Sequence, residues 1–226
     1  DFTFDALFRE NRFNGADRIG DANQLTLALE SRTLSGADGS ERLRLGIGQI
    51  YYFEDREVQL PGVPERTDSS SPLVAGASAR IGRHWSLGGA LEWDPDEERT
   101  ERSSARLEYN RDGDRILNMA YRLRRGLVED TDVSARWPLT AGLHAVARWR
   151  YSLLYDQTVD AFAGLEYDSC CWVLRAVGRH WADELVDGGD THTGVFLQLE
   201  LKGLTSLGSG VDDMLEKGIL GYGNHY

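Results

Sequence analysis

Residues 193–203 read Thr-Gly-Val-Phe-Leu-Gln-Leu-Glu-Leu-Lys-Gly, and apolar and polar side chains alternate along most of this stretch. Successive side chains of a β-strand point to opposite faces, whereas a helix with a period of 3.6 residues would mix the two sets. One face then carries Val195, Leu197, Leu199 and Leu201, and the other carries Phe196, Gln198, Glu200 and Lys202. The stretch therefore predicts a strand with one side suited to hydrocarbon and the other to water.

The same two-sided pattern recurs along the chain and predicts about eleven antiparallel strands without a long helix. The expected strands cover residues 23–33, 41–54, 73–81, 85–94, 103–110, 115–124, 131–137, 141–153, 158–167, 170–181 and 193–202. Many of them have about the 9–11 residues that a tilted strand needs to cross a bilayer. The predicted fold class is therefore all-β, an antiparallel transmembrane β-barrel.

The composition is compatible with this prediction, although it looks soluble at first. Charged residues make up 27% of the 226 residues, and the mean hydropathy is −0.44. The sequence has no run of 18 apolar residues, which excludes a transmembrane helix. A membrane barrel shows lipid only every second residue, so its average hydropathy stays low. The formal charge of −12 argues against nucleic acid as a partner, since binding it requires a basic face.

The expected connections alternate between short turns and longer charged loops, as in outer-membrane barrels with short periplasmic turns. The short connections are 34–40, 82–84, 110–114, 138–140 and 168–169, and the longer ones are 55–72, 95–102, 125–130, 154–157 and 182–192. Tryptophan and tyrosine lie mostly at strand ends, as interface girdles require. The expected strand count is odd, and the first expected strand starts on the outside. Both features predict that upstream strands are missing and that this is the C-terminal half of an incomplete barrel. We expect an extracellular loop at 1–22, the barrel wall at 23–202, and a periplasmic or lumenal tail at 203–226.

Cys170 and Cys171 are the two cysteines of the chain, and they are adjacent. Neighbouring cysteines rarely bond to each other because the peptide between them would be strained. Two reduced thiols, a metal half-site and bonds to two cysteines outside this chain all remain open, and the last is preferred because periplasmic disulfides persist. A zinc site would need further ligands at short spacing, so neither a metal nor a cofactor is expected.

The remaining candidate motifs point to structure rather than to catalysis. The five histidines are scattered and form no recognised catalytic motif; they are His84, His144, His180, His192 and His225. The glycine-rich residues 203–210 have no lysine of a phosphate loop and are interpreted as a flexible turn. Residues 211–218 predict a short helix that Asp212, Asp213 and Glu216 could cap; a cation site is the alternative.

Several segments in order resemble the LptD family of lipopolysaccharide (LPS) assembly proteins, specifically the C-terminal half of its barrel. They are Leu7–Phe13, Asp17–Gln24, Gly48–Phe53, the Cys170–Cys171 pair with the basic strand after it, Gly194–Leu204 and Met214–Tyr222. The resemblance implies a periplasmic jelly roll and a barrel of about twenty-six strands. It also implies an LptE-like plug lipoprotein in the lumen, a periplasmic LPS bridge protein, and assembly of LPS into the outer leaflet of the cell outer membrane.

The resemblance assigns roles to two candidate sites. Cys170 and Cys171 would form disulfides with cysteines near the N-terminus of the family's proteins. The last strand would be one side of a lateral gate through which LPS leaves, and its residues are Gly194, Val195, Phe196, Leu197, Gln198, Leu199, Glu200 and Leu201. Membrane lipid and LPS are the other expected partners, and no catalytic residue is implied.

The polar face of the expected sheet carries many charges that would line a wet lumen. They include Arg32, Arg80, Arg106, Arg122, Arg136 and Arg148 with Glu30, Glu92, Glu108 and Glu166. Plain solvation is the favoured interpretation, and contact with LPS phosphates or the plug protein is the alternative. A passive porin fits the alternation alone equally well, and a soluble β-sandwich binding module would instead place the apolar faces against one another.

Overall fold

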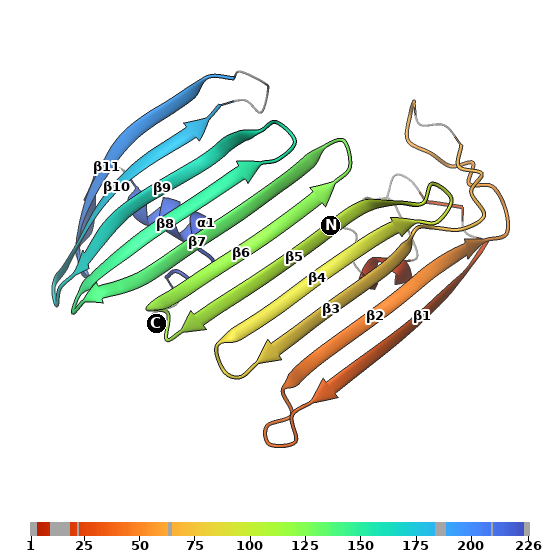
Figure 1. Cartoon of the computed structure of the whole chain (residues 1–226), viewed down its shortest axis with the longest axis horizontal. Helices are drawn as coiled ribbons and strands as arrows, with labels where there is room; N and C mark the ends of the chain where they lie inside the picture. The colour runs from red at the N-terminus through yellow and green to blue at the C-terminus, as the bar shows by residue number, and fades with distance from the viewer. Residues whose placement is uncertain are drawn as a thin grey trace. The chain divides into compact units, whose positions relative to one another are not determined.

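The computed structural model describes residues 4–9, 19–21, 23–62, 65–183, 189–208 and 210–223. Its elements are η1 (Phe4–Phe8), β1 (Gln24–Leu34), β2 (Glu41–Tyr52), β3 (Leu73–Ile81), β4 (Trp85–Asp94), β5 (Arg99–Arg111), β6 (Arg115–Arg124), β7 (Val128–Thr140), β8 (Leu143–Ser152), β9 (Gln157–Asp168), β10 (Trp172–Ala182), β11 (Thr191–Leu201), β12 (Thr205–Gly208) and α1 (Val211–Gly218). The strands follow one another in sheet order from β1 to β12, and Figure 1 labels β1 to β11 in this order. No helix in these described ranges is long and apolar enough to cross a membrane.

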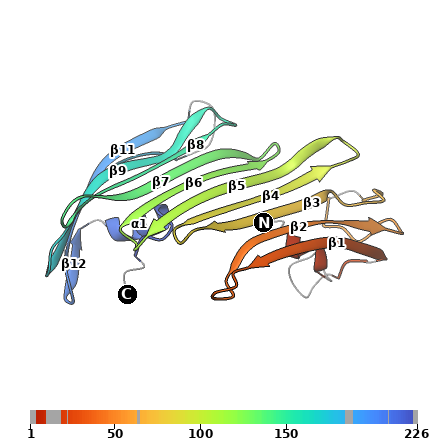
Figure 2. The same ribbon diagram turned by 60° about the horizontal axis from the view of Figure 1, so that its bottom comes forward.

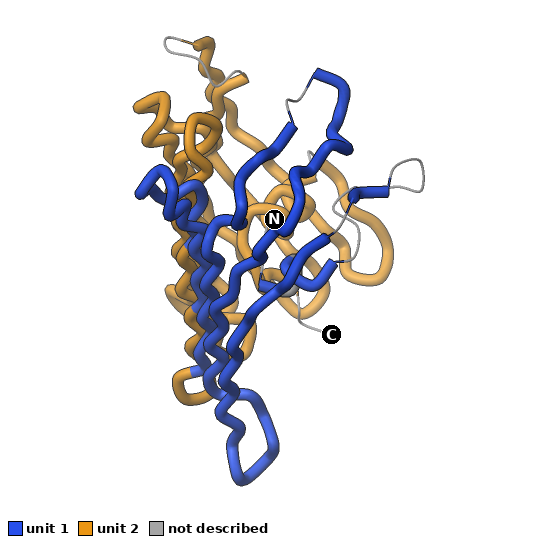
Figure 3. Tube along the Cα trace, turned by 90° about the vertical axis from the view of Figure 1, so that its right-hand side faces the viewer, with its two compact units in different colours: residues 1–80, 88–104 blue, residues 81–87, 105–226 orange. Residues whose placement is uncertain are grey.

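The chain divides into two compact units (Figure 3). The first contains residues 1–80 and 88–104, and the second contains residues 81–87 and 105–226. The first unit holds η1, β1, β2 and almost all of β3. The second holds β6 to β12 and α1, together with the candidate sites.

The eleven predicted strands and their faces are confirmed, but β12 makes twelve strands among the described residues, so the predicted odd strand count is wrong. Strands β3, β4 and β6 have the predicted bounds, and the other long strands differ by a few residues at their ends. The apolar face is largely exposed, with 72% of Leu29 and 77% of Val195 accessible. A soluble β-sandwich would bury this face, whereas a membrane strand turns it to lipid.

Three local predictions are wrong. The interpretation of residues 203–210 as a flexible turn is wrong for Thr205–Gly208, which forms β12 and pairs with β11. The start of the expected 1–22 loop contains η1, although residues 10–18 lie outside the described residues. Two of the expected longer loops also shrink, because β5 and β7 begin earlier than predicted, which leaves only residues 95–98 and 125–127 as connections.

In the first unit, η1 packs on the polar face of β2. Leu7 is 1% exposed and belongs to a small core with Ile50 and Val74. Gly48 allows this approach, because a Cβ at that position would lie 2.7 Å from Leu7 Cδ1. The same face that carries arginines elsewhere is therefore covered by an apolar helix at this point.

In the second unit, α1 covers the polar face of the sheet (Figure 2). The predicted helix at 211–218 is confirmed, and the core around it consists of Ile116, Val146, Phe162, Val177, Val211, Leu215 and Ile219. Gly218 lies directly on the Phe162 ring, where a Cβ would be 2.7 Å from Phe162 Cε1. An eight-residue helix is marginal on its own in water, so this packing is what stabilises it.

Aromatic side chains gather at the ends of the strands in the second unit. Near the short turns, Trp85 and Tyr109 have ring centroids 4.7 Å apart, and Trp137 lies 6.2 Å from Tyr109. This arrangement fits an interface girdle. Trp181 also lies at a strand end, as predicted, but it belongs to the polar face rather than to a girdle, because its ring lies 6.2 Å from Phe196, which packs there.

Candidate functional site

The predicted gate strand lies in β11, which pairs with β10 along its whole length, from Thr191 opposite Ala182 to Leu201 opposite Trp172. On its other side, β12 pairs only with Gln198–Leu201. The turn-end section of β11, Gln198–Leu201, therefore has a neighbouring strand on each side. In the described part of the chain, its loop-end section, Thr191–Phe196, has only β10 beside it in the register.

The two cysteines lie in the turn between β9 and β10, and both are exposed and free. Their Sγ atoms are 2.7 Å apart, which is a thiol contact rather than a bond. Lys202 Nζ donates to Asp168 Oδ1 and to the Ser169 carbonyl oxygen at 2.8 Å, so a cation stands at the same turn. The hydrogen bond between the thiols lowers the pKa of Cys170 and raises the pKa of Cys171, and the charge of Lys202 adds to the lowering.

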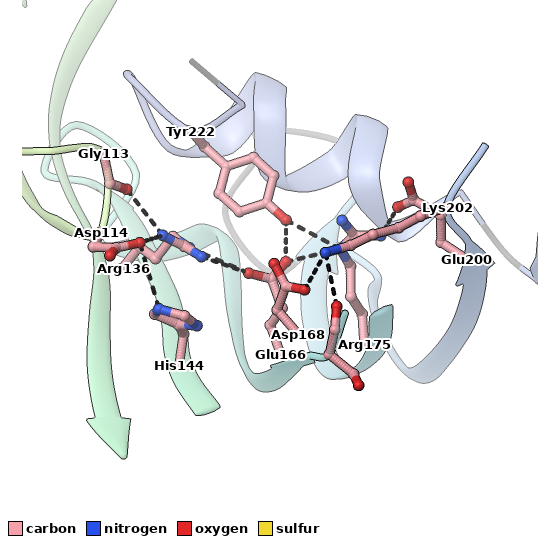
Figure 4. A network of polar contacts seen from close by, with 11 residues as sticks. Gly113, Asp114, Arg136, His144, Glu166, Asp168, Arg175, Glu200, Lys202 and Tyr222 are labelled. Atoms are coloured by element: carbon pink, nitrogen blue, oxygen red, sulfur yellow. Dashed lines mark hydrogen bonds and ion pairs between the residues drawn. The ribbon is translucent and has the colours of Figure 1, made fainter. Parts of the chain in front are cut away.

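A buried ion network lies on the polar face close to this turn (Figure 4). Glu166 is 3% exposed and stands at its centre. Its Oε1 accepts from Arg136 Nη2 at 2.9 Å, and its Oε2 accepts from Arg175 Nε at 2.8 Å. One carboxylate thus joins two buried guanidiniums from β7 and β10.

Each of the two arginines also donates to further acceptors, which help to balance its charge. Arg136 Nη1 donates to the Gly113 carbonyl oxygen and to Asp114 Oδ1, both at 2.9 Å. Arg175 Nη1 donates to Glu200 Oε2 on β11 at 2.7 Å. The network therefore contains two guanidiniums and three carboxylates, which is how buried charges are kept in a folded protein.

The C-terminal tail supplies the last member of the network. The Tyr222 hydroxyl donates to Glu166 Oε2 and accepts from Arg175 Nε at 3.0 Å. Burial raises the pKa of Tyr222, and the negative charge of Glu166 raises it further. The hydroxyl therefore stays protonated and remains a donor to Glu166.

The strand register brings these side chains together. Glu166 is opposite His144 on β8 and Arg175 on β10, and Arg175 is opposite Gln198 on β11. His144 is 7% exposed, and its Nε2 lies 3.6 Å from Asp114 Oδ1. The sequence alternation placed these residues on the polar face, but it did not show which of them share a row.

The interpretation of the charges as plainly solvated is wrong for Arg136 and Glu166, whose side chains are each 4% exposed in a direct ion pair. It describes Arg106 better, because that side chain is 67% exposed. Nearer the loop end, Arg122 and Arg150 both donate to the buried carboxylate of Asp130. The sequence signal for such pairs is weak: arginine and acidic residues recur on the polar faces of neighbouring strands, but only the register shows which of them meet.

The acidic residues of the tail are arranged differently from the prediction. Gly210 is the N-cap of α1 and makes no side-chain cap hydrogen bond, while Asp212 and Asp213 lie inside the first turn. Gln198 of β11 takes the capping role, because its Oε1 accepts from the Asp212 backbone N–H at 2.8 Å. The described residues contain no group of three or more His, Cys, Asp or Glu side chains placed to hold a metal ion.

An antiparallel sheet with one exposed apolar face and one polar face with buried ion pairs defines the class, which is the wall of a membrane β-barrel. The family model described as LptD, LPS transport system D, matches residues 1–151. The chain belongs to the LptD family.

Three relatives illustrate the match, and each is named LPS-assembly protein LptD. The protein of Nitrosococcus oceani is 46% identical over all of this chain and 30% of its own length. Those of Pseudomonas aeruginosa (strain UCBPP-PA14) and Aromatoleum aromaticum are 39% and 40% identical over 98% and 99% of this chain, and 28% of their own lengths. The chain spans less than a third of the length of these relatives and matches their C-terminal part.

Proposed function

We propose that this chain is the C-terminal part of the barrel wall of an outer-membrane protein that assembles LPS into the outer leaflet. The two-faced sheet carries the proposal, because exposed apolar residues suit lipid while the opposite face is polar. The relatives' name supports LPS as the substrate. In this role β11 is one side of a lateral gate, formed by Gly194–Leu201, that lets LPS leave sideways.

The loop-end section of β11 would be the part of the gate that opens. A seam opens easily where few ladder hydrogen bonds hold it, since each contributes only about 0.5–1.5 kcal/mol net. The partner strand would come from the rest of the protein. An LptE-like plug lipoprotein in the lumen and a periplasmic bridge protein that delivers LPS complete the proposal.

LPS delivery is the experiment that tests the proposed function. Cells depleted of their own LptD should regain newly made LPS at the surface when the whole protein containing this segment is expressed. The same protein lacking residues 191–202 should fail, because one side of the gate is gone. Normal surface LPS with the deletion would contradict the gate. Rapid sugar uptake by liposomes containing the intact protein, with no effect on LPS, would favour a passive porin instead.

The cysteine proposal has its own test. We propose that Cys170 and Cys171 each pair with a cysteine elsewhere in the whole protein, because both are exposed at a turn that would face the periplasm. The whole protein should then migrate differently with and without a reducing agent in electrophoresis. The double variant C170S/C171S should lose that difference. An unchanged mobility of the parent protein would refute the pairing.

A further inference from the structure

The section of β11 near the short turns is tied to the C-terminal tail through two consecutive residues of its polar face. Gln198 is 2% exposed and caps α1 through the Asp212 N–H. Glu200 holds Arg175, and Arg175 in turn donates to the Tyr222 hydroxyl. Both ends of the segment Val211–Tyr222 therefore contact polar-face side chains of β10 and β11.

The same segment also reaches strands far from β11. Leu215 and Ile219 are fully buried in the core with Ile116 of β6 and Val146 of β8. The Leu220 carbonyl oxygen accepts from Asn118 Nδ2 on β6 at 3.1 Å. A strand that would otherwise contact only its sheet neighbours is thus linked across the polar face to β6.

The loop-end section of β11 lacks this support in the part of the chain that the structure describes. β12 ends at Gly208, opposite Gln198. Above that point Gly194 offers no side chain, and the side-chain bonds of His192 and Thr193 run to Asp183 and His180 near the loop. Val195 is 77% exposed on the opposite face. Only Phe196 packs against the core under α1.

We infer that Val211–Tyr222 is a clamp that fixes the turn-end section of β11 to the wall, so that the strand separates from its seam partner only along Thr191–Phe196. The inference rests on the proposed gate and deepens it. Gln198 and Tyr222 are the positioning residues of this clamp. Gln198 marks the boundary between the fixed section of β11 and the section that separates. LPS would then pass at the loop end of the seam while the turn end stays closed.

Amide hydrogen exchange of the whole protein in detergent tests the clamp. Peptides over residues 198–201 should exchange at least about tenfold more slowly than peptides over 191–196, because local opening sets the exchange rate. Gln198→Ala should speed exchange over 198–201 by about tenfold, the factor that corresponds to losing one buried hydrogen bond. Tyr222→Phe should act in the same direction.

Thr193→Ala is the matched control, because it removes a side-chain hydrogen bond of the same strand in the loop-end section. It should leave residues 198–201 unchanged. Uniform exchange along β11 in the parent protein would overturn the clamp, and because this outcome needs no variant, the clamp stays falsifiable even where Gln198→Ala fails to fold. Equal effects of Gln198→Ala and Thr193→Ala on residues 198–201 would also overturn it.

The two proposals fail in distinguishable ways. Slow exchange over 198–201 and fast exchange over 191–196, with no restoration of surface LPS, would leave the clamp in place and remove the gate function. Restored surface LPS with uniform exchange would retain the function and remove the clamp. With both correct, Q198A/Y222F should also admit a large antibiotic that the intact outer membrane excludes, because the turn end of the seam then opens.

Discussion

Replacing Glu166 with glutamine should lower the free energy of unfolding by about 3 kcal/mol, because it removes the carboxylate shared by two buried guanidiniums. Arg136 would keep the carboxylate of Asp114 and Arg175 that of Glu200, but both guanidiniums would lose the buried negative charge that they share. The measurement is a urea titration of the whole protein in detergent, followed by the loss of its folded electrophoretic form.

Asp112→Asn makes the same chemical change at an exposed turn and serves as the control. The Asp112 side chain is 80% exposed beside Arg111, so the change should cost less than about 0.5 kcal/mol. If Glu166→Gln were as mild as Asp112→Asn, the network would not stabilise the fold, and its charges would be as well solvated in the folded state as in the unfolded one.

Leu215→Ala is the second large effect, and it should detach the tail from the wall. Leu215 is 0% exposed in the core under α1, and such truncations cost about 2–5 kcal/mol. Amide exchange of residues 211–219 should therefore rise by about 30-fold or more. Leu220→Ala is the control, since Leu220 is 63% exposed. Equal exchange in the two variants would show that α1 does not depend on this packing.

Strand positions were predictable because alternation with a period of two is a local property. Leu117, Met119 and Tyr121 alternate with polar or small residues without interruption, and β6 has its predicted bounds. β12 escaped prediction because its four residues, Thr205–Gly208, have neither the length nor the apolar face of the others. Its pairing comes from the turn after β11 rather than from its own pattern.

The site was only partly predictable for a similar reason. The alternation assigns Glu166 and Arg136 to the polar face, but burial follows from the register between strands and from the tail that covers them. Tyr222 lies 56 residues from Glu166 in the sequence, and no local pattern connects them. The adjacent cysteines were conspicuous, whereas the roles proposed for them depend on parts of the protein beyond this chain.

The central claim is that hydrocarbon wets one face of this sheet and water the other. Nitroxide amino acids at four successive positions of β6 in the membrane-embedded whole protein test it most directly. Labels at Met119 and Tyr121 should be relaxed by oxygen dissolved in the lipid, and labels at Ala120 and Arg122 by a water-soluble nickel chelate. An accessibility pattern without this two-residue alternation, or oxygen and nickel excluded at all four positions, would contradict the account.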